Sequence, residues 1–408
     1  MIKNRFLQAG VLILFATILM FFKFDQIPKG LAHDENELAR VAFSLENKPY
    51  TAFTPVADGH GTPYFYTLLG SFKIFGINQF ALRLPSKIFG IISILLLYFI
   101  LREVFKKDIL AFAFSLLLLT SRWYLHFSRV SFEMPFLLFL ELVSAYSAVL
   151  FLKTRRYVYL ILSGVAAGIA YNSYQPGRIF FLVPLAIFFL TKIPLKRIVL
   201  YFLVPFLLCI LPMSFYLVQH PANDIRINEQ FFLKNTSLSL QEKVQFLGSN
   251  IAQTALMFVS VGDMNGQHNY PGKPALNPIF FVFFIIGFIK VCLDFREPFN
   301  SFFLLYFFIA LLPTILTYPW ENPNMLRTYT ALPSIIYFTG QGILLAYNVL
   351  RAKIKSERLI IIILAFLVGC SLFYELRTYF LFHSLVFKQA FDIPDYLSII
   401  RQNALNGR

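Results

Sequence analysis

Residues 11–22 read VLILFATILMFF, and apolar runs of this kind decide the fold of the chain. They recur through most of the 408 residues, of which 58% are hydrophobic and only 14% are charged. A soluble domain of this size would carry far more polar surface. A run of about 20 apolar residues can cross a bilayer as a helix, which satisfies its own backbone hydrogen bonds in lipid. The sequence therefore predicts an all-α integral membrane protein.

The apolar runs predict about eleven transmembrane helices. They lie at residues 8–24, 82–101, 110–121, 131–152, 157–171, 178–190, 198–218, 278–293, 299–317, 331–350 and 359–376. We expect the short run at 110–121 to extend into its flanks. Lys3 and Arg5 are also typical of a signal peptide, but residues 30–32 make a poor cleavage site, so we interpret the first run as an uncleaved span. One transmembrane domain is thus expected over residues 1–376, with a short tail over 377–408.

Basic residues predict the orientation of these helices. Alternate loops carry clusters of Lys and Arg, and the positive-inside rule places such loops and the N-terminus in the cytoplasm. The clustered residues are Lys3, Arg5, Arg102, Lys106, Lys107, Lys153, Arg155, Arg156, Lys192, Lys196, Arg197, Lys290, Arg296, Arg351, Lys353, Lys355 and Arg358. Two long loops, at 25–81 and 219–277, and the tail then lie outside. The formal net charge of +15 follows from this asymmetry and does not indicate nucleic-acid binding.

The two long outer loops are expected to contain short helices of their own. Residues 33–45 (HDENELARVAFSL) have an amphipathic pattern that follows Asp34, a fair N-cap. Residues 64–75 are apolar but too short to span, and we expect them to lie at the membrane interface. Residues 240–257 form a second amphipathic stretch. No cytoplasmic loop has a comparable mixture of polar residues, so any reaction is expected on the outer side.

Several motifs on that side together resemble the GT-C superfamily, in the branch of protein O-mannosyltransferases and lipid A aminoarabinose transferases. The resemblance covers about residues 1–335. The motifs are Asp34-Glu35, Arg83-Leu84-Pro85-Ser86, Leu125-His126-Phe127-Ser128-Arg129 with Glu133, Tyr174-Gln175-Pro176-Gly177-Arg178, Gly262-Asp263-Met264-Asn265 with His268, and Asn324-Met325-Leu326-Arg327. The family often has Lys-Pro-Pro where this chain has Asp58-Gly59-His60-Gly61-Thr62-Pro63. A protonated His60 is expected to replace that Lys near the donor phosphate.

The resemblance implies inverting transfer of a sugar from a polyprenyl-phosphate carrier to an extracytoplasmic protein, lipid or glycan. Asp34 is then expected to act as general base on the acceptor hydroxyl. Glu35 is expected to orient the site or to hold a divalent metal, and Glu133 to contact sugar or acceptor hydroxyls. From the residues alone, three structural alternatives stay open. Asp34 could be a simple N-cap, Glu35 a first-turn carboxylate, and Glu133 an ion-pair partner of Arg129 four residues earlier.

The remaining candidates are substrate contacts. Arg83, Arg178 and Arg327 lie at outer span ends and suit the phosphate, although anchoring to lipid headgroups would explain them equally. His126 and Arg129 cluster with Glu133, and His126 and His268 could contact the sugar or bind a metal. Tyr174 could stack on a sugar ring or belong to an interfacial aromatic belt.

Two other classes of function remain open. A lipid-linked glycan flippase would need polar residues along a path across the bilayer, where Glu141 stands nearly alone. A glycan polymerase or ligase that uses pyrophosphate-linked oligosaccharides would need the same outer arrangement of polar residues.

Overall fold

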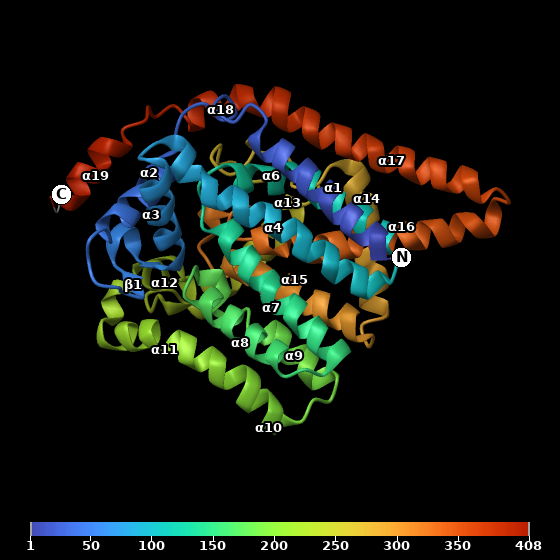
Figure 1. Cartoon of the computed structure of the whole chain (residues 1–408), viewed down its shortest axis with the longest axis horizontal. Helices are drawn as coiled ribbons and strands as arrows, with labels where there is room; N and C mark the ends of the chain where they lie inside the picture. Colours follow the sequence, from blue (N-terminus) through green and yellow to red (C-terminus); the bar gives the residue numbers. More distant parts are fainter. Residues whose placement is uncertain (1, 407–408) are drawn as a thin grey trace.

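The computed structural model describes residues 2–406, and almost all of its regular structure is helical (Figure 1). The α-helices are α1 (Ile2–Phe21), α2 (His33–Ser44), α3 (Pro63–Phe75), α4 (Gln79–Phe105), α5 (Asp108–Thr120), α6 (Arg122–Arg129), α7 (Met134–Thr154), α8 (Val158–Tyr171), α9 (Leu182–Leu190), α10 (Leu195–Ile198), α11 (Val204–Gln219), α12 (Ile225–Gln230), α13 (Leu240–Met257), α14 (Pro278–Leu293), α15 (Pro298–Ile315), α16 (Leu332–Lys353), α17 (Glu357–Arg377), α18 (Ser384–Ala390) and α19 (Leu397–Leu405). The one small sheet pairs β1 (Phe53–Thr54) with β2 (His60–Gly61) in antiparallel fashion.

Five helical segments within residues 2–406 are long and apolar enough to cross a membrane. They are Gln79–Phe105, Met134–Thr154, Leu195–Gln219, Pro298–Ile315 and Glu357–Ala390. Four further apolar helices are shorter, at Arg5–Phe21, Val158–Tyr171, Gln175–Leu190 and Pro278–Leu293. A helix occupies each predicted apolar run, which confirms a helical membrane protein, but helix length does not confirm eleven spans.

The short run at residues 110–121 forms a bent pair of helices. α5 ends at Thr120, and α6 continues from Arg122 at an angle of 63°. If this pair is one span, the number of candidate spans is six.

Several segments predicted to be cytoplasmic and several predicted to be outer lie toward opposite ends of the molecule. The N-terminus and the turn between α16 and α17 lie at one end of Figure 1, and α2, α3, β1, α12 and α19 lie at the other. The long outer loops contain the expected helices: α2 and α3 in the first, and α13 in the second. α3 has 13 residues and is therefore too short to span, as predicted.

The chain after residue 376 returns to α2. The helix that begins as α17 continues through a π-helical turn into α18 and ends at Ala390. Leu31 then pairs with Ile393 in an isolated β-bridge, and Arg401 of α19 forms a bidentate ion pair with Glu46, at 2.6 and 2.8 Å. This C-terminal segment therefore covers α2 and the chain on both sides of it.

Candidate active site

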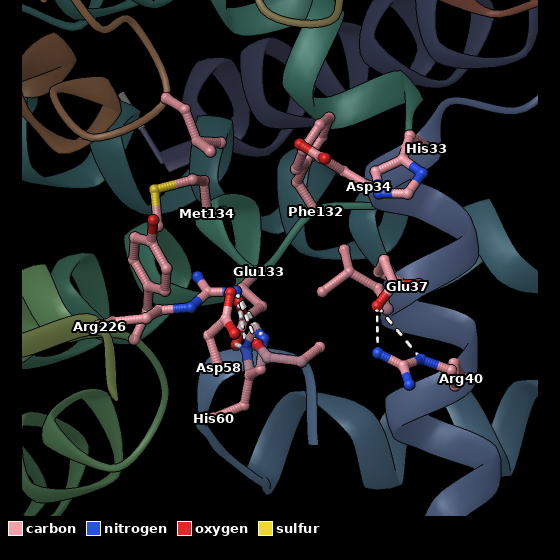
Figure 2. Close-up of a pocket in the computed structure, with 14 residues that line it drawn as sticks. His33, Asp34, Glu37, Arg40, Asp58, His60, Phe132, Glu133, Met134 and Arg226 are labelled. Atoms are coloured by element: carbon pink, nitrogen blue, oxygen red, sulfur yellow. Dashed lines mark hydrogen bonds and ion pairs between the residues drawn. The ribbon is translucent and has the colours of Figure 1, made fainter. Parts of the chain in front are cut away.

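Segments distant in sequence meet around a polar cavity of about 260 Å³, here called the first cavity. Its charged lining residues are Asp34, Glu37, Arg40, Asp58, Glu133 and Arg226. Figure 2 shows Asp34, Glu37 and Arg40 along α2 on one wall, and Asp58, His60, Glu133 and Arg226 gathered on the other. All of these residues belong to the two long predicted outer loops except Glu133, which lies at the outer end of the predicted span 131–152.

Asp34 lies in the first turn of α2 and keeps about 38% of its side chain exposed. The helix begins two residues earlier than expected, with Ala32 at the N-cap, because the Glu35 carboxylate accepts the backbone N–H of Ala32 at 3.1 Å. The interpretation of Asp34 as the N-cap is therefore wrong. Its carboxylate is left available at the cavity wall.

His268 reaches Asp34 from the second outer loop. Its Nε2 lies 3.8 Å from Oδ2 of Asp34, and its Nδ1 lies 3.0 Å from Oδ2 of Asp263. Burial would by itself lower the pKa of His268, but the two carboxylates raise that pKa to about 9. Burial would likewise raise the pKa of Asp34, yet its ion pair with His268 holds that pKa below the ordinary value. Both groups are thus charged near neutral pH.

Glu133, His60 and Arg226 form a second chain of polar contacts. Nε2 of His60 accepts a hydrogen bond from Arg226 at 2.7 Å, so the proton lies on Nδ1, which donates to Glu133 at 3.1 Å. This geometry does not support the prediction of a protonated His60 at the phosphate. The predicted Arg129–Glu133 ion pair is also absent from the described residues, because α6 ends at Arg129 and Glu133 turns to His60.

Glu35 and Arg83 form a fully buried bidentate ion pair, with two contacts of 2.7 Å. Arg83 also donates to the backbone oxygens of Pro28 and Gly30, and Glu35 accepts the backbone N–H of Ser131. Neither side chain lines the first cavity or the second cavity that is described below. The expectation that Arg83 contacts substrate and that Glu35 binds a metal does not fit this burial, because all their polar atoms already have partners.

His126 and Arg129 are also buried away from the first cavity. Arg129 donates to backbone oxygens near the end of α1, including those of Leu19 and Phe22. His126 lies within hydrogen-bond distance of the Gln267 carbonyl, at 2.6 Å, and stacks on Phe387. These predicted substrate contacts therefore hold outer segments together.

A second cavity of about 330 Å³ adjoins the first and is mostly apolar. Tyr174 and Arg226 line both cavities. Arg178 and Arg327 also line the second one, each with a carboxylate partner, Asp224 and Glu321 respectively. Its apolar wall includes Ile179, Phe231, Leu312 and Leu316. The second cavity therefore combines three arginine side chains with an apolar wall, and it lies beside the polar first cavity.

Arg226, like Glu37 and Arg40, lines the first cavity and was not among the residues predicted from the sequence. It forms no ion pair with any carboxylate among residues 2–406, and its nearest polar contacts are His60 and the carbonyl of Ala57. Residues 224–226 (DIR) match no motif, so no local signal distinguishes this arginine from other basic residues of the same loop. The structure brings Arg226 of α12 to the site through its contact with His60 of β2.

The structure does not support the metal site that the resemblance suggests at Glu35. Among the residues that the structure describes, no group of three or more His, Cys, Asp or Glu side chains could hold a metal ion. The hydrogen bonds to both Glu35 oxygens leave that carboxylate no free ligand position.

The bent helices, the outer helices of the first loop and the paired cavities define an α-helical membrane protein with a candidate site among its predicted outer segments. Residues 60–216 match the family described as dolichyl-phosphate-mannose-protein mannosyltransferase. Together with the structures below, this match confirms the resemblance to the branch of protein O-mannosyltransferases and lipid A aminoarabinose transferases. Among curated proteins, no sequence match to the chain was found.

Two solved structures share the fold over nearly the whole chain. The crystal structure of ArnT from Cupriavidus metallidurans bound to undecaprenyl phosphate matches with a TM-score of 0.58 and 13% identity, over 97% of this chain and 78% of that one. The apo structure of the same protein matches with a TM-score of 0.53 and 12% identity, over 97% and 77%. At such identities the likeness establishes the fold alone.

Proposed function

We propose that the protein transfers a sugar from a polyprenyl-phosphate carrier to an extracytoplasmic acceptor, with inversion at the anomeric carbon. The observation that carries this proposal is the junction of the two cavities at Tyr174 and Arg226. The apolar second cavity suits a polyprenyl chain, and its arginines suit a phosphate. The polar first cavity suits the sugar and the acceptor hydroxyl. The family match and the ligand named for the ArnT structure support this assignment.

Asp34 is the proposed general base. Its carboxylate takes the proton of the acceptor hydroxyl as the oxygen attacks the anomeric carbon. The bond between that carbon and the phosphate oxygen breaks, and its electron pair stays with the polyprenyl monophosphate. The proton then leaves Asp34 for water through the open cavity. Glu133, held by His60, is placed to accept hydrogen bonds from sugar or acceptor hydroxyls.

The leaving phosphate gains negative charge as the bond breaks. An arginine guanidinium group can donate two parallel hydrogen bonds to two phosphate oxygens. These hydrogen bonds become stronger as negative charge develops on the oxygens. Arg226 has no carboxylate partner among the described residues, so its charge is the least compensated of the three arginines of the second cavity. We therefore assign the phosphate to Arg226, with Arg178 and Arg327 beside it.

This chemistry requires the cavities to face outward. We propose that all eleven predicted helices cross the membrane, with the N-terminus in the cytoplasm and the active site outside. The chain is then a multi-pass protein of the cell membrane, with residues 377–408 outside as a tail in which α19 packs on α2. The asymmetry of Lys and Arg between loops supports this orientation.

A transfer assay tests the proposal. Purified protein in lipid nanodiscs is given undecaprenyl-phosphate-linked radiolabelled hexoses and a crude envelope extract as acceptor. The expected result is label in the extract and an equal amount of undecaprenyl monophosphate. Movement of carrier across vesicle bilayers without any release would instead establish a flippase. Consumption of pyrophosphate-linked glycans alone would establish a polymerase or ligase.

A further inference from the structure

Asp263, His268 and Asp34 form a line of alternating charge that ends at the first cavity. His268 is only about 7% exposed, and Asp263 about 5%, whereas Asp34 is open to the cavity. Nε2 of His268 is buried and has no hydrogen-bond partner among the described residues. The carboxylate that it faces, 3.8 Å away, is that of the proposed base.

The geometry of Asp263 fixes the direction in which His268 points. Oδ2 of Asp263 accepts the backbone N–H of Met325 at 2.8 Å, and Oδ1 accepts that of Asn265 at 2.8 Å. Because Oδ2 also lies 3.0 Å from Nδ1 of His268, the imidazole is anchored by that nitrogen. The rings of Phe127 and Phe132 lie beside the imidazole, with centroids 6.0 and 6.2 Å away. The free Nε2 is therefore held toward Asp34.

We propose that His268, held as an imidazolium by Asp263, is a positioning residue that keeps the Asp34 carboxylate ionised and oriented toward the acceptor hydroxyl. This inference rests on the proposed function, because it assigns His268 to the support of that base. The sequence predicts a different role for His268, as a contact of the sugar or of a metal. In the structure it does not line the first cavity, so it acts through Asp34.

The charges around the pair support a cationic His268. Asp263 and Asp34 face it, and they raise its pKa to about 9 against the opposing effect of burial. His126 is the other titratable group near its ring, and two further groups act on Asp34, namely His33 and Arg226. If His268 lost its proton, the Nε2 lone pair would face the Asp34 carboxylate. The two would then repel, and the carboxylate would lose its orientation.

The same pair resets the base after each turnover. When Asp34 accepts the proton of the acceptor, it loses its charge while the cation of His268 remains. Because that cation holds the pKa of Asp34 below its ordinary value, the proton is released readily to water. The line of charge thus favours an ionised base at the start of each cycle.

A histidine titration by NMR tests this inference without requiring activity. The full chain carries six histidines, and the His268→Gln variant assigns the signal of interest in protein labelled at histidine. In wild type that signal is expected to titrate near pH 9. In Asp34→Asn and in Asp263→Asn it should titrate at a lower pH, since each variant removes one carboxylate. A wild-type titration in the ordinary range, unchanged in both variants, would overturn the proposal.

Kinetics give the second readout. In His268→Gln, kcat should fall roughly tenfold or more, because part of the general-base contribution of about 10²–10⁴ is lost. Affinity for undecaprenyl phosphate should stay unchanged. In wild type, kcat should fall above about pH 9, where His268 loses its proton, and this fall should be absent from His268→Gln. His220→Gln, at an exposed histidine, is the control and should behave as wild type.

A His268→Gln variant with wild-type kcat would contradict the positioning role. So would a variant that loses donor affinity and kcat in parallel, because that pattern indicates structural damage. If no carrier-linked sugar is transferred by wild type but the NMR shifts occur as expected, the proposed function fails while the charge line stands. The two failures are therefore distinguishable.

Discussion

The carboxylate of Asp34 lies 3.8 Å from Nε2 of His268, although the two residues come from different outer loops. This contact joins the first turn of α2 to the segment that follows α13. The carboxylate of Asp34 lies at the wall of the first cavity, whereas the neighbouring carboxylate of Glu35 forms a buried ion pair with Arg83. The structure therefore separates two adjacent acidic residues into one exposed and one structural group.

Transfer should continue to lower pH than an ordinary aspartate base would allow. The base acts only when ionised, and the ion pair with His268 holds the pKa of Asp34 below its usual value near 3.8. The acid limb of the kcat profile should thus lie below that pH, and it should move upward in His268→Gln. A limb at the same position in both proteins would show that another group limits the rate at low pH.

Arg226→Gln should weaken the binding of undecaprenyl phosphate about tenfold or more, equivalent to roughly 1.4 kcal/mol. The reason is that Arg226 lines both cavities and has no carboxylate partner among the described residues. Binding can be measured by titration of the lipid into protein in nanodiscs. Arg40→Gln is the matched control, because Arg40 lines the first cavity but not the second. An equal loss in both variants would argue against a phosphate site at Arg226.

Glu133→Gln and His60→Gln should each lower kcat/KM, and their effects should not be additive. His60 contacts both Glu133 and Arg226, so removal of either residue breaks the same chain of contacts. The double variant is therefore expected to lose little more than the worse single variant, whereas independent residues give additive losses. Full additivity in the measured kcat/KM would refute a shared role.

Glu35→Gln should destabilise the protein rather than remove its chemistry. Breaking a buried ion pair costs about 3–5 kcal/mol because it leaves an uncompensated charge in the interior. Thermal unfolding in nanodiscs should thus occur at a lower temperature, while the folded fraction keeps its kcat. Asp58→Asn, at an exposed carboxylate, should unfold like wild type. Normal stability with a lost kcat would restore Glu35 to a catalytic role.

The sequence predicted the helices well because their signal is local. Each long apolar run became a helix, and the amphipathic stretch at residues 240–257 became α13. The sequence did not predict the bend at Ser121, because an apolar run such as 110–121 indicates a helix but not a change in the direction of its axis. The N-cap of α2 was misplaced by two residues because Glu35, not Asp34, satisfies the backbone at that end.

The candidate site was predicted less well, and the reason is long-range pairing. Asp34, Glu133, Tyr174, Arg178 and Arg327, which belong to motifs, line two joined cavities, and their roles there stay predictions. A motif cannot tell whether an arginine faces a ligand or the backbone carbonyls of another segment. Arg83 and Arg129 face such carbonyls, at Pro28 and Phe22, whereas Arg226, which carries no motif, faces the cavities.

The comparison of Asp34→Asn with Asp58→Asn tests the central claim most directly. Both variants neutralise a carboxylate that lines the first cavity, and only Asp34 is paired with His268. The measurement is the initial rate of label transfer from undecaprenyl-phosphate hexose, at equal amounts of bound carrier. We expect Asp34→Asn to lose about 10²-fold or more and Asp58→Asn to stay close to wild type. Transfer by Asp34→Asn at the wild-type rate would contradict the assignment of Asp34 as the base.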